Sequence, residues 1–169
     1  MFRSAHGKRL IPVAHSRDVG WLLGEYAMHQ EAIFAPMIAF TLLVFLLWMQ
    51  LGFVRISGSR RGVISPEYIR LGSGSTPPEY VVAIHRHFSN LFEVPLLFYA
   101  GCISLFVLDG VDTLAMALTW LFVLMRCVHT LIVLRTNRPQ QRVGPYVLSC
   151  CAVWGLWFLV LWRATASAA

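Results

Sequence analysis

Charged residues are scarce in this sequence. They make up 13% of its 169 residues, whereas 57% are hydrophobic, and the mean hydropathy is +0.64. A soluble domain needs polar side chains over its whole surface, and this composition supplies too few of them. The scarcity of charge therefore excludes an ordinary soluble protein and predicts an integral membrane protein.

Metal-binding patterns and targeting signals are also missing. The sequence contains no CxxC or Cys/His metal pattern, so we expect no metal site. The four cysteines fall within apolar segments, where we expect them to serve as packing residues: Cys102, Cys127, Cys150 and Cys151. Pro12 and His15 interrupt the one N-terminal apolar stretch, which excludes a secretory signal peptide. No repeat or low-complexity tract occurs.

Four segments are long enough to cross a hydrocarbon core of about 30 Å: residues 32–54, about 86–108, 113–134 and 143–161. They predict an all-α membrane domain over residues 31–163, built as a four-helix bundle. Residues 1–30 form an N-terminal tail and 164–169 a short C-terminal tail. Met28 lies just before the first span, so either translation starts there or residues 1–27 are a genuine tail.

Two prolines mark the connections. Pro66 starts a short helical turn over residues 65–70 in an otherwise irregular loop, and Pro139 prevents the third span from continuing.

The arginines gather in the first and third connections: Arg55, Arg60, Arg61, Arg70, Arg86, Arg135, Arg138 and Arg142. The second connection holds only acidic residues, Asp109 and Asp112. By the positive-inside rule, the first and third loops face the cytoplasm and both termini face away. This topology explains the net charge of +6, so we expect no nucleic-acid partner.

The second span carries polar residues into the membrane. Its near end holds Arg86, His87, Asn90 and Glu93, and the uncharged stretch that follows covers only about 22 Å. Counting heights from the opposite membrane face places Glu93 at about 24 Å and Arg126 at about 21 Å. Because a membrane-embedded charge is costly, we expect these two residues to form an ion pair.

Helical spacing places the other polar residues near the same depth. Three sets each share a helix face: Arg86, Asn90 and Glu93; Arg126 and His129; Arg142 and Tyr146. The layer is either a purely structural ion-pair network or a pocket that also binds a ligand. Its arginines, glutamate and amide suit an anionic ligand that carries an amine, and glutathione has both groups and a thiol.

The same residues resemble the MAPEG family, the membrane-associated proteins in eicosanoid and glutathione metabolism. "RHFSNLFEVPLLF" resembles its second-helix motif, "LFVLMRCVHTLIV" its third-helix Arg-x-x-His segment, and "NRPQQRVGPY" the start of its fourth helix. The resemblance covers about residues 30–163. It implies a homotrimer of four-helix bundles with glutathione, a co-substrate, bound between subunits near the cytoplasmic side.

The resemblance also implies roles for particular residues. Those that would contact or support glutathione are Arg86, Asn90, Glu93, Arg126, His129 and Tyr146. Arg142 would activate the thiol, and Arg55 matches a basic residue at the end of the first helix. Val133 and Val143 stand where other members carry tyrosine or serine, which disfavours prostaglandin or leukotriene synthesis. The "NLFEVP" stretch of the second helix resembles bacterial members, which implies a location in the inner membrane.

The sequence therefore predicts a membrane-embedded glutathione-dependent transferase or peroxidase. Its substrate would be a small lipophilic electrophile that enters from the bilayer, and its partners would be membrane lipids and further copies of the chain. The alternative is a non-catalytic family member that binds lipid or has a structural role. A small transporter subunit is disfavoured because no helix carries paired Gly/Pro interruptions at mid-depth.

Overall fold

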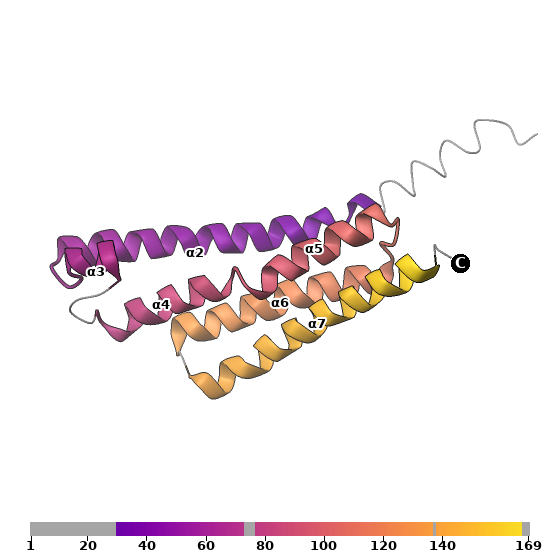
Figure 1. Cartoon of the computed structure of the whole chain (residues 1–169). Helices are drawn as coiled ribbons and strands as arrows, with labels where there is room; N and C mark the ends of the chain where they lie inside the picture. Colours follow the sequence, from indigo (N-terminus) through magenta and orange to yellow (C-terminus); the bar gives the residue numbers. More distant parts are fainter. Residues whose placement is uncertain (1–29, 73–76, 137, 167–169) are drawn as a thin grey trace, which may run out of the picture.

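The structure is a computed structural model that describes residues 30–72, 77–136 and 138–166. Residues 1–29 of the predicted N-terminal tail 1–30, including the alternative start Met28, and Asn137 lie outside the described residues. Within the described ranges all regular structure is helical (Figure 1): α2 (Phe34–Arg60), α3 (Pro66–Leu71), α4 (Glu79–Asn90), α5 (Val94–Val107), α6 (Thr113–Arg135) and α7 (Pro139–Ala166).

Four stretches are long and apolar enough to cross a membrane, namely α2, α4 together with α5, α6, and α7. The predicted all-helical membrane architecture with four spans is confirmed. The helices run side by side along one long axis, and the short α3 lies beside the C-terminal end of α2 (Figure 1).

Local sequence explains where the shorter elements begin and end. The Ser65 hydroxyl accepts a hydrogen bond from the Tyr68 backbone N–H at 3.1 Å and caps α3, with Pro66 in its first turn. Gly72 ends α3 in the left-handed conformation, at φ 70°. The short helical turn predicted behind Pro66 is therefore confirmed. Pro139 also behaves as predicted, because α6 ends at Arg135 and α7 begins at the proline.

The second span is not one continuous helix, as the sequence analysis assumed. A turn at residues 91–93 separates α4 from α5. Pro95 has no N–H to donate to the carbonyl of Leu91, and its ring would clash with that carbonyl in a continuous helix. This span alone is interrupted among the four described ones, so the paired breaks typical of a transporter are not found in these ranges.

Aromatic side chains form the centre of the bundle. The rings of Phe98 on α5 and Phe122 on α6 stack with centroids 4.1 Å apart, and Phe40 on α2 lies 5.2 Å from Phe122. All three side chains are fully buried. Between membrane spans such rings gain from close packing and ring–ring contact, about 0.5–1.5 kcal/mol per aromatic pair, so the cluster holds three spans together.

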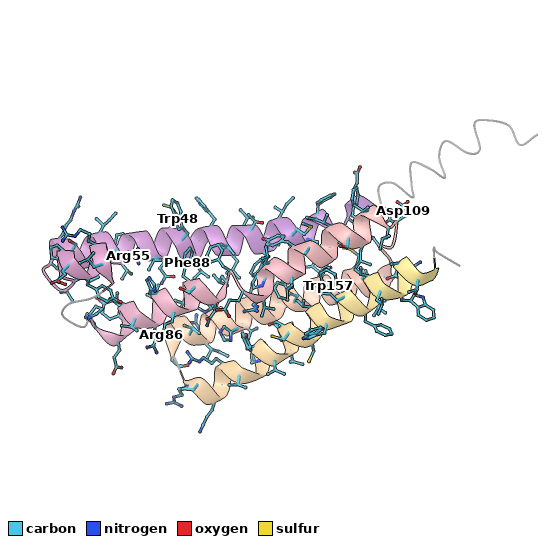
Figure 2. The ribbon with its side chains drawn as sticks, in the orientation of Figure 1. Trp48, Arg55, Arg86, Phe88, Asp109 and Trp157 are labelled. Carbon is cyan, nitrogen blue, oxygen red and sulfur yellow. The ribbon has the colours of Figure 1, made fainter. Side chains whose placement is uncertain are left out.

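The outer side of α2 is apolar and exposed. Figure 2 shows Trp48 pointing away from the other helices, and Leu46 and Phe53 are also exposed. Large exposed apolar residues on a spanning helix face lipid or another membrane protein.

The end of the bundle near Asp109 is closed by paired polar groups. The Gln30 side chain donates to the Val111 carbonyl at 3.2 Å and accepts from the Val111 N–H at 3.0 Å. Asp112 accepts from the Ala115 N–H at 2.8 Å, capping α6, and forms a 2.8 Å ion pair with Arg163 of α7. These contacts tie the chain before α2, the α5–α6 connection and the end of α7 together.

Candidate functional site

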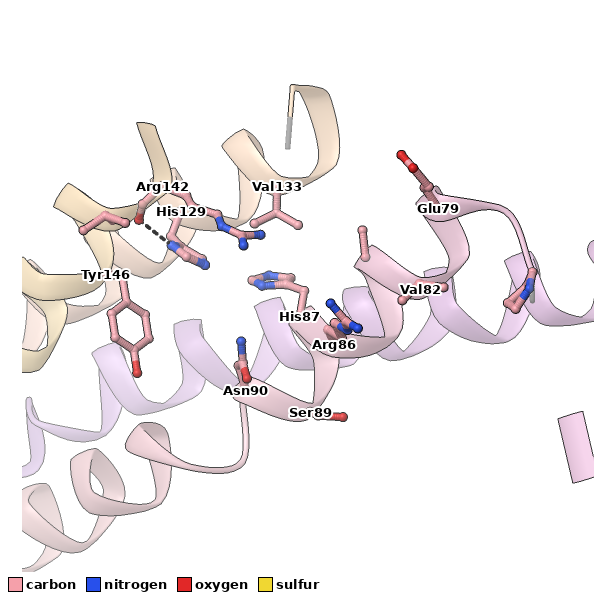
Figure 3. Close-up of a pocket in the computed structure, with 13 residues that line it drawn as sticks. Glu79, Val82, Arg86, His87, Ser89, Asn90, His129, Val133, Arg142 and Tyr146 are labelled. Carbon is pink, nitrogen blue, oxygen red and sulfur yellow. Dashed lines mark hydrogen bonds between the residues drawn. The ribbon is translucent and has the colours of Figure 1, made fainter. Parts of the chain in front are cut away.

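A cavity of about 750 Å³ opens between α4, α6 and α7, toward the end of the bundle opposite Asp109 (Figure 3). Pockets that hold small ligands usually measure about 300–1,000 Å³. Five of the predicted site residues line it: Arg86, Asn90, His129, Arg142 and Tyr146. Three helices therefore do bring their polar residues to one place.

Arg86 and Asn90 reach the cavity because they lie one helical turn apart on α4. Both side chains are exposed to the cavity and its opening rather than packed in the core. Arg142 and Tyr146 share the same spacing on α7 and line the opposite wall. The cavity thus has a guanidinium group on each of two facing helices.

His129 of α6 is held by α7. Its Nδ1 lies 2.9 Å from the backbone carbonyl of Arg142, and a carbonyl can only accept, so Nδ1 carries the proton and donates it. This hydrogen bond fixes the imidazole orientation and leaves Nε2 as the other polar atom of the ring. The ring also lies 5.7 Å from that of Tyr146.

His87 is a cavity residue that the sequence analysis did not place. Its side chain is 4% exposed, its Nε2 lies 3.0 Å from the Thr130 hydroxyl, and its ring centroid is 5.3 Å from that of His129. Nδ1 is buried without a hydrogen-bond partner among the described residues. A helical wheel would have found it, because position 87 borders the face that Arg86 and Asn90 share.

Arg126 lies in the protein interior and does not line the cavity wall. Its side chain is 1% exposed, and its guanidinium carbon lies 5.1 Å from the Tyr146 ring centroid and 5.4 Å from that of Phe122. Those contacts are cation–π interactions. None of the three guanidinium nitrogens has a hydrogen-bond partner within the described ranges. Tyr146 therefore separates a buried cation from the cavity.

The expected ion pair between Glu93 and Arg126 does not form within the described chain. Glu93 is exposed and lies at the turn that precedes α5. The prediction assumed that Glu93 shares a helix face with Arg86 and Asn90. The interruption caused by Pro95 removes that alignment, because α4 has already ended at Asn90.

In the described ranges, the structure contains no group of three or more His, Cys, Asp or Glu side chains placed to hold a metal ion. The four cysteines are free thiols, of which Cys102 is buried, Cys127 and Cys150 are half-buried and Cys151 is exposed, so the expected packing role fits Cys102 best.

Comparison with models of known protein families shows to which family the chain belongs. The MAPEG family model matches residues 33–162, which include the first three spans, most of the fourth and every cavity residue. The chain belongs to the MAPEG family. The resemblance found in the sequence motifs is confirmed. Searches of curated proteins and of solved structures returned no match.

The MAPEG cavity combines cationic, amide and imidazole groups with apolar walls. Guanidinium groups bind carboxylates through paired hydrogen bonds, and the Asn90 amide can both donate and accept. Val82, Val133 and Val143 supply apolar surface beside them. The arrangement can bind an anionic polar molecule next to an apolar one.

Proposed function

We propose that this MAPEG protein is a membrane-embedded glutathione-dependent transferase or peroxidase that acts on a small lipophilic electrophile. The observation that carries the proposal is the 750 Å³ cavity, which Arg86 of α4 and Arg142 of α7 both line. Family membership supports chemistry related to glutathione.

The charge of the cavity fits glutathione. This peptide carries two carboxylates, one ammonium and one thiol; two arginines of the cavity suit the carboxylates, and Asn90 suits a peptide group. Arg126, whose buried nitrogens have no partner in the described chain, adds positive charge behind Tyr146. The carboxylate of Glu93 would support glutathione binding through its charge. His129 would support it by holding the part of α7 that lines the cavity.

Bound glutathione supplies the thiol that attacks the electrophile. Arg142 would place its positive charge beside the sulfur and favour the thiolate, which is the nucleophilic form. In a transfer reaction the thiol loses its proton, a sulfur–carbon bond forms, and the electrophile's leaving group departs with the bonding electrons. His129 would keep the Arg142 backbone in place through its 2.9 Å hydrogen bond.

The proposal also includes the assembly of the protein and its location in the cell. The exposed apolar faces of the helices suit contact with membrane lipids and with further copies of the chain in a homotrimer. The arginine-rich end of the bundle would face the cytoplasm, in the inner membrane of a bacterium. The lipophilic substrate would then reach the cavity from the bilayer.

Glutathione binding by the purified protein in detergent tests the proposal. We expect saturable binding, a thiolate absorbance that appears at lower pH than for free glutathione, and conjugation of a generic lipophilic electrophile. Binding without conjugation of any electrophile or reduction of any hydroperoxide in a broad panel would favour the non-catalytic alternative. Absence of both binding and turnover would refute the proposal.

A further inference from the structure

A second surface feature lies at the C-terminal end of α2, away from the cavity. A groove of about 310 Å³ is lined by four residues of this helix and the residue that follows it: Phe53, Ile56, Ser57, Arg60 and Arg61. Their spacing of i, i+3, i+4, i+7 and i+8 makes them one continuous stripe along the helix.

The stripe is apolar at one end and positively charged at the other. Phe53 and Ile56 are 72% and 57% exposed, and the two arginines at the other end are exposed as well. α2 has 27 residues and therefore spans about 40 Å, about 10 Å more than a hydrocarbon core. The apolar part of the stripe thus reaches the hydrocarbon boundary, and Arg60 and Arg61 reach the headgroup layer.

The chain after α2 folds back and leaves this stripe open. The backbone N–H groups of Val63 and Ile64 both donate to the carbonyl of Gly58, at 2.9 and 3.2 Å. A side chain at Gly58 would come within 2.5 Å of Ile64, so glycine permits this close return. The returning segment covers the face that carries Gly58, which is not part of the stripe.

Neither arginine of the stripe has an acidic partner in the part of the chain that the structure describes. Arg60 and Arg61 form no ion pair or side-chain hydrogen bond there, and the acidic residue of α3, Glu67, does not reach them. Two adjacent guanidinium groups above an apolar strip are complementary to a phosphate attached to an acyl chain.

We propose that this stripe binds one anionic phospholipid of the cytoplasmic leaflet. Arg60 and Arg61 hold the headgroup phosphate, and an acyl chain lies along Phe53 and Ile56. The site is separate from the glutathione cavity and shares no residue with it.

The test measures lipid binding to the full chain in detergent by native mass spectrometry, during titration with phosphatidylglycerol or phosphatidylcholine. We expect the wild type to prefer phosphatidylglycerol, and the Arg60→Gln/Arg61→Gln variant to bind it about thirtyfold more weakly. The matched control is Arg135→Gln/Arg138→Gln, which removes two exposed arginines at the same end of the bundle. We expect the control to change affinity less than about twofold.

Further arms identify the ligand. Phe53→Ala is expected to weaken phosphatidylglycerol binding severalfold, because the acyl chain loses its apolar contact. Inorganic phosphate at the same concentration is expected to displace no lipid. Glutathione binding and helix content are expected to stay unchanged, and if the double variant loses helix content, each single variant is measured in its place, with about a fivefold loss expected.

Four results would overturn the proposal. Equal losses in the two arginine pairs would mean that only general surface charge matters. A wild type without preference for phosphatidylglycerol would exclude the site, and displacement by inorganic phosphate would make it a phosphate site. A change in the mass of the assembly in the Arg60→Gln/Arg61→Gln variant would assign the stripe to contact between copies.

Discussion

The two ends of the bundle differ in whether their buried polar groups have hydrogen-bond partners within the described chain. At the end near Asp109, Gln30 satisfies both backbone groups of Val111, and Asp112 is paired with Arg163 while it caps α6. At the other end, the structure leaves buried nitrogens of His87 and Arg126 without partners in the described chain, beside a large cavity.

This difference distinguishes polar residues that stabilise the fold from polar residues that we expect to bind a ligand. Buried polar groups without a hydrogen bond cost about 1–3 kcal/mol each, so a fold whose only role was to pack would pair them. The closed end does pair them, and its contacts join the entry to α2, the α5–α6 connection and α7. We therefore expect substitutions at the closed end to change stability, and substitutions at the cavity end to change binding and turnover.

The largest expected effect is that of Arg142→Leu on turnover. In the proposed reaction, conjugation of glutathione should fall about 100- to 1,000-fold, because the charge that would stabilise the developing thiolate is lost. Stability should change little, since His129 bonds the backbone carbonyl of residue 142, which the substitution keeps. Steady-state kinetics and thermal unfolding in detergent measure the two effects.

Arg138→Leu is the control for that substitution, because Arg138 is exposed and does not line the cavity. A comparable loss of turnover in Arg138→Leu would contradict a specific role for Arg142. If Arg142→Leu lost stability and Arg138→Leu did not, Arg142 would be assigned to packing. The cavity end would then contribute to stability, as the closed end does.

Gln30→Leu should produce the largest loss of stability, about 3 kcal/mol in the free energy of unfolding. It removes two hydrogen bonds and leaves the buried N–H and carbonyl of Val111 unpaired. Denaturant titration in detergent measures the loss, and Glu31→Gln, an exposed neighbour, is the control. Unchanged stability, or a specific loss of glutathione affinity, would show that this end is not purely structural.

A smaller effect is expected at Asp112. Asp112→Ala should cost about 1 kcal/mol of stability through loss of the α6 cap, whereas Asp112→Asn should cost less, because asparagine also caps helices. Thermal unfolding of the two variants in the same detergent gives the comparison. Equal losses would assign the effect to the charge and the Arg163 ion pair rather than to the cap.

Asp112 should also make stability depend on pH. The hydrogen bond from the Ala115 N–H lowers the pKa of its carboxyl, against an opposing effect of burial, and Arg163 lowers it further. The carboxylate therefore stabilises the fold above the ordinary carboxyl pKa of about 4, and this contribution is lost as the pH falls through the lowered value. The acid-induced drop should be smaller in Asp112→Asn; an identical acid profile in both proteins would refute this role.

The smallest expected effect is the coupling between Glu93 and Arg126. A double-mutant cycle with Glu93→Gln and Arg126→Met should give a coupling energy below about 0.5 kcal/mol, because the two side chains form no ion pair in the described chain. The cycle is measured by unfolding in detergent. A coupling above about 1 kcal/mol would show that a Glu93 carboxylate reaches Arg126 in the assembled protein.

The candidate site could be predicted in part because its residues follow helical spacing. Arg86 with Asn90, and Arg142 with Tyr146, were assigned to one pocket from their four-residue separations, and the structure places all four on the cavity wall. Glu93 was assigned wrongly to the face of Arg86 and Asn90, because the spacing rule holds only within one continuous helix. His87 was missed because only residues at helical spacings of three, four and seven were grouped, although position 87 borders the face that Arg86 and Asn90 share.

Composition and the lengths of the apolar segments were enough to determine that the chain has four membrane spans. A helix satisfies its own backbone hydrogen bonds in the membrane, and it needs about 20 apolar residues to cross the hydrocarbon core. Three sequence motifs resembled the MAPEG family, and the family model confirmed the membership. Tertiary structure alone decided that Arg126 lies behind Tyr146 and that Gln30 closes the opposite end against Val111. Both contacts join residues far apart in the sequence, and their partners depend on how the helices pack, which no local pattern records.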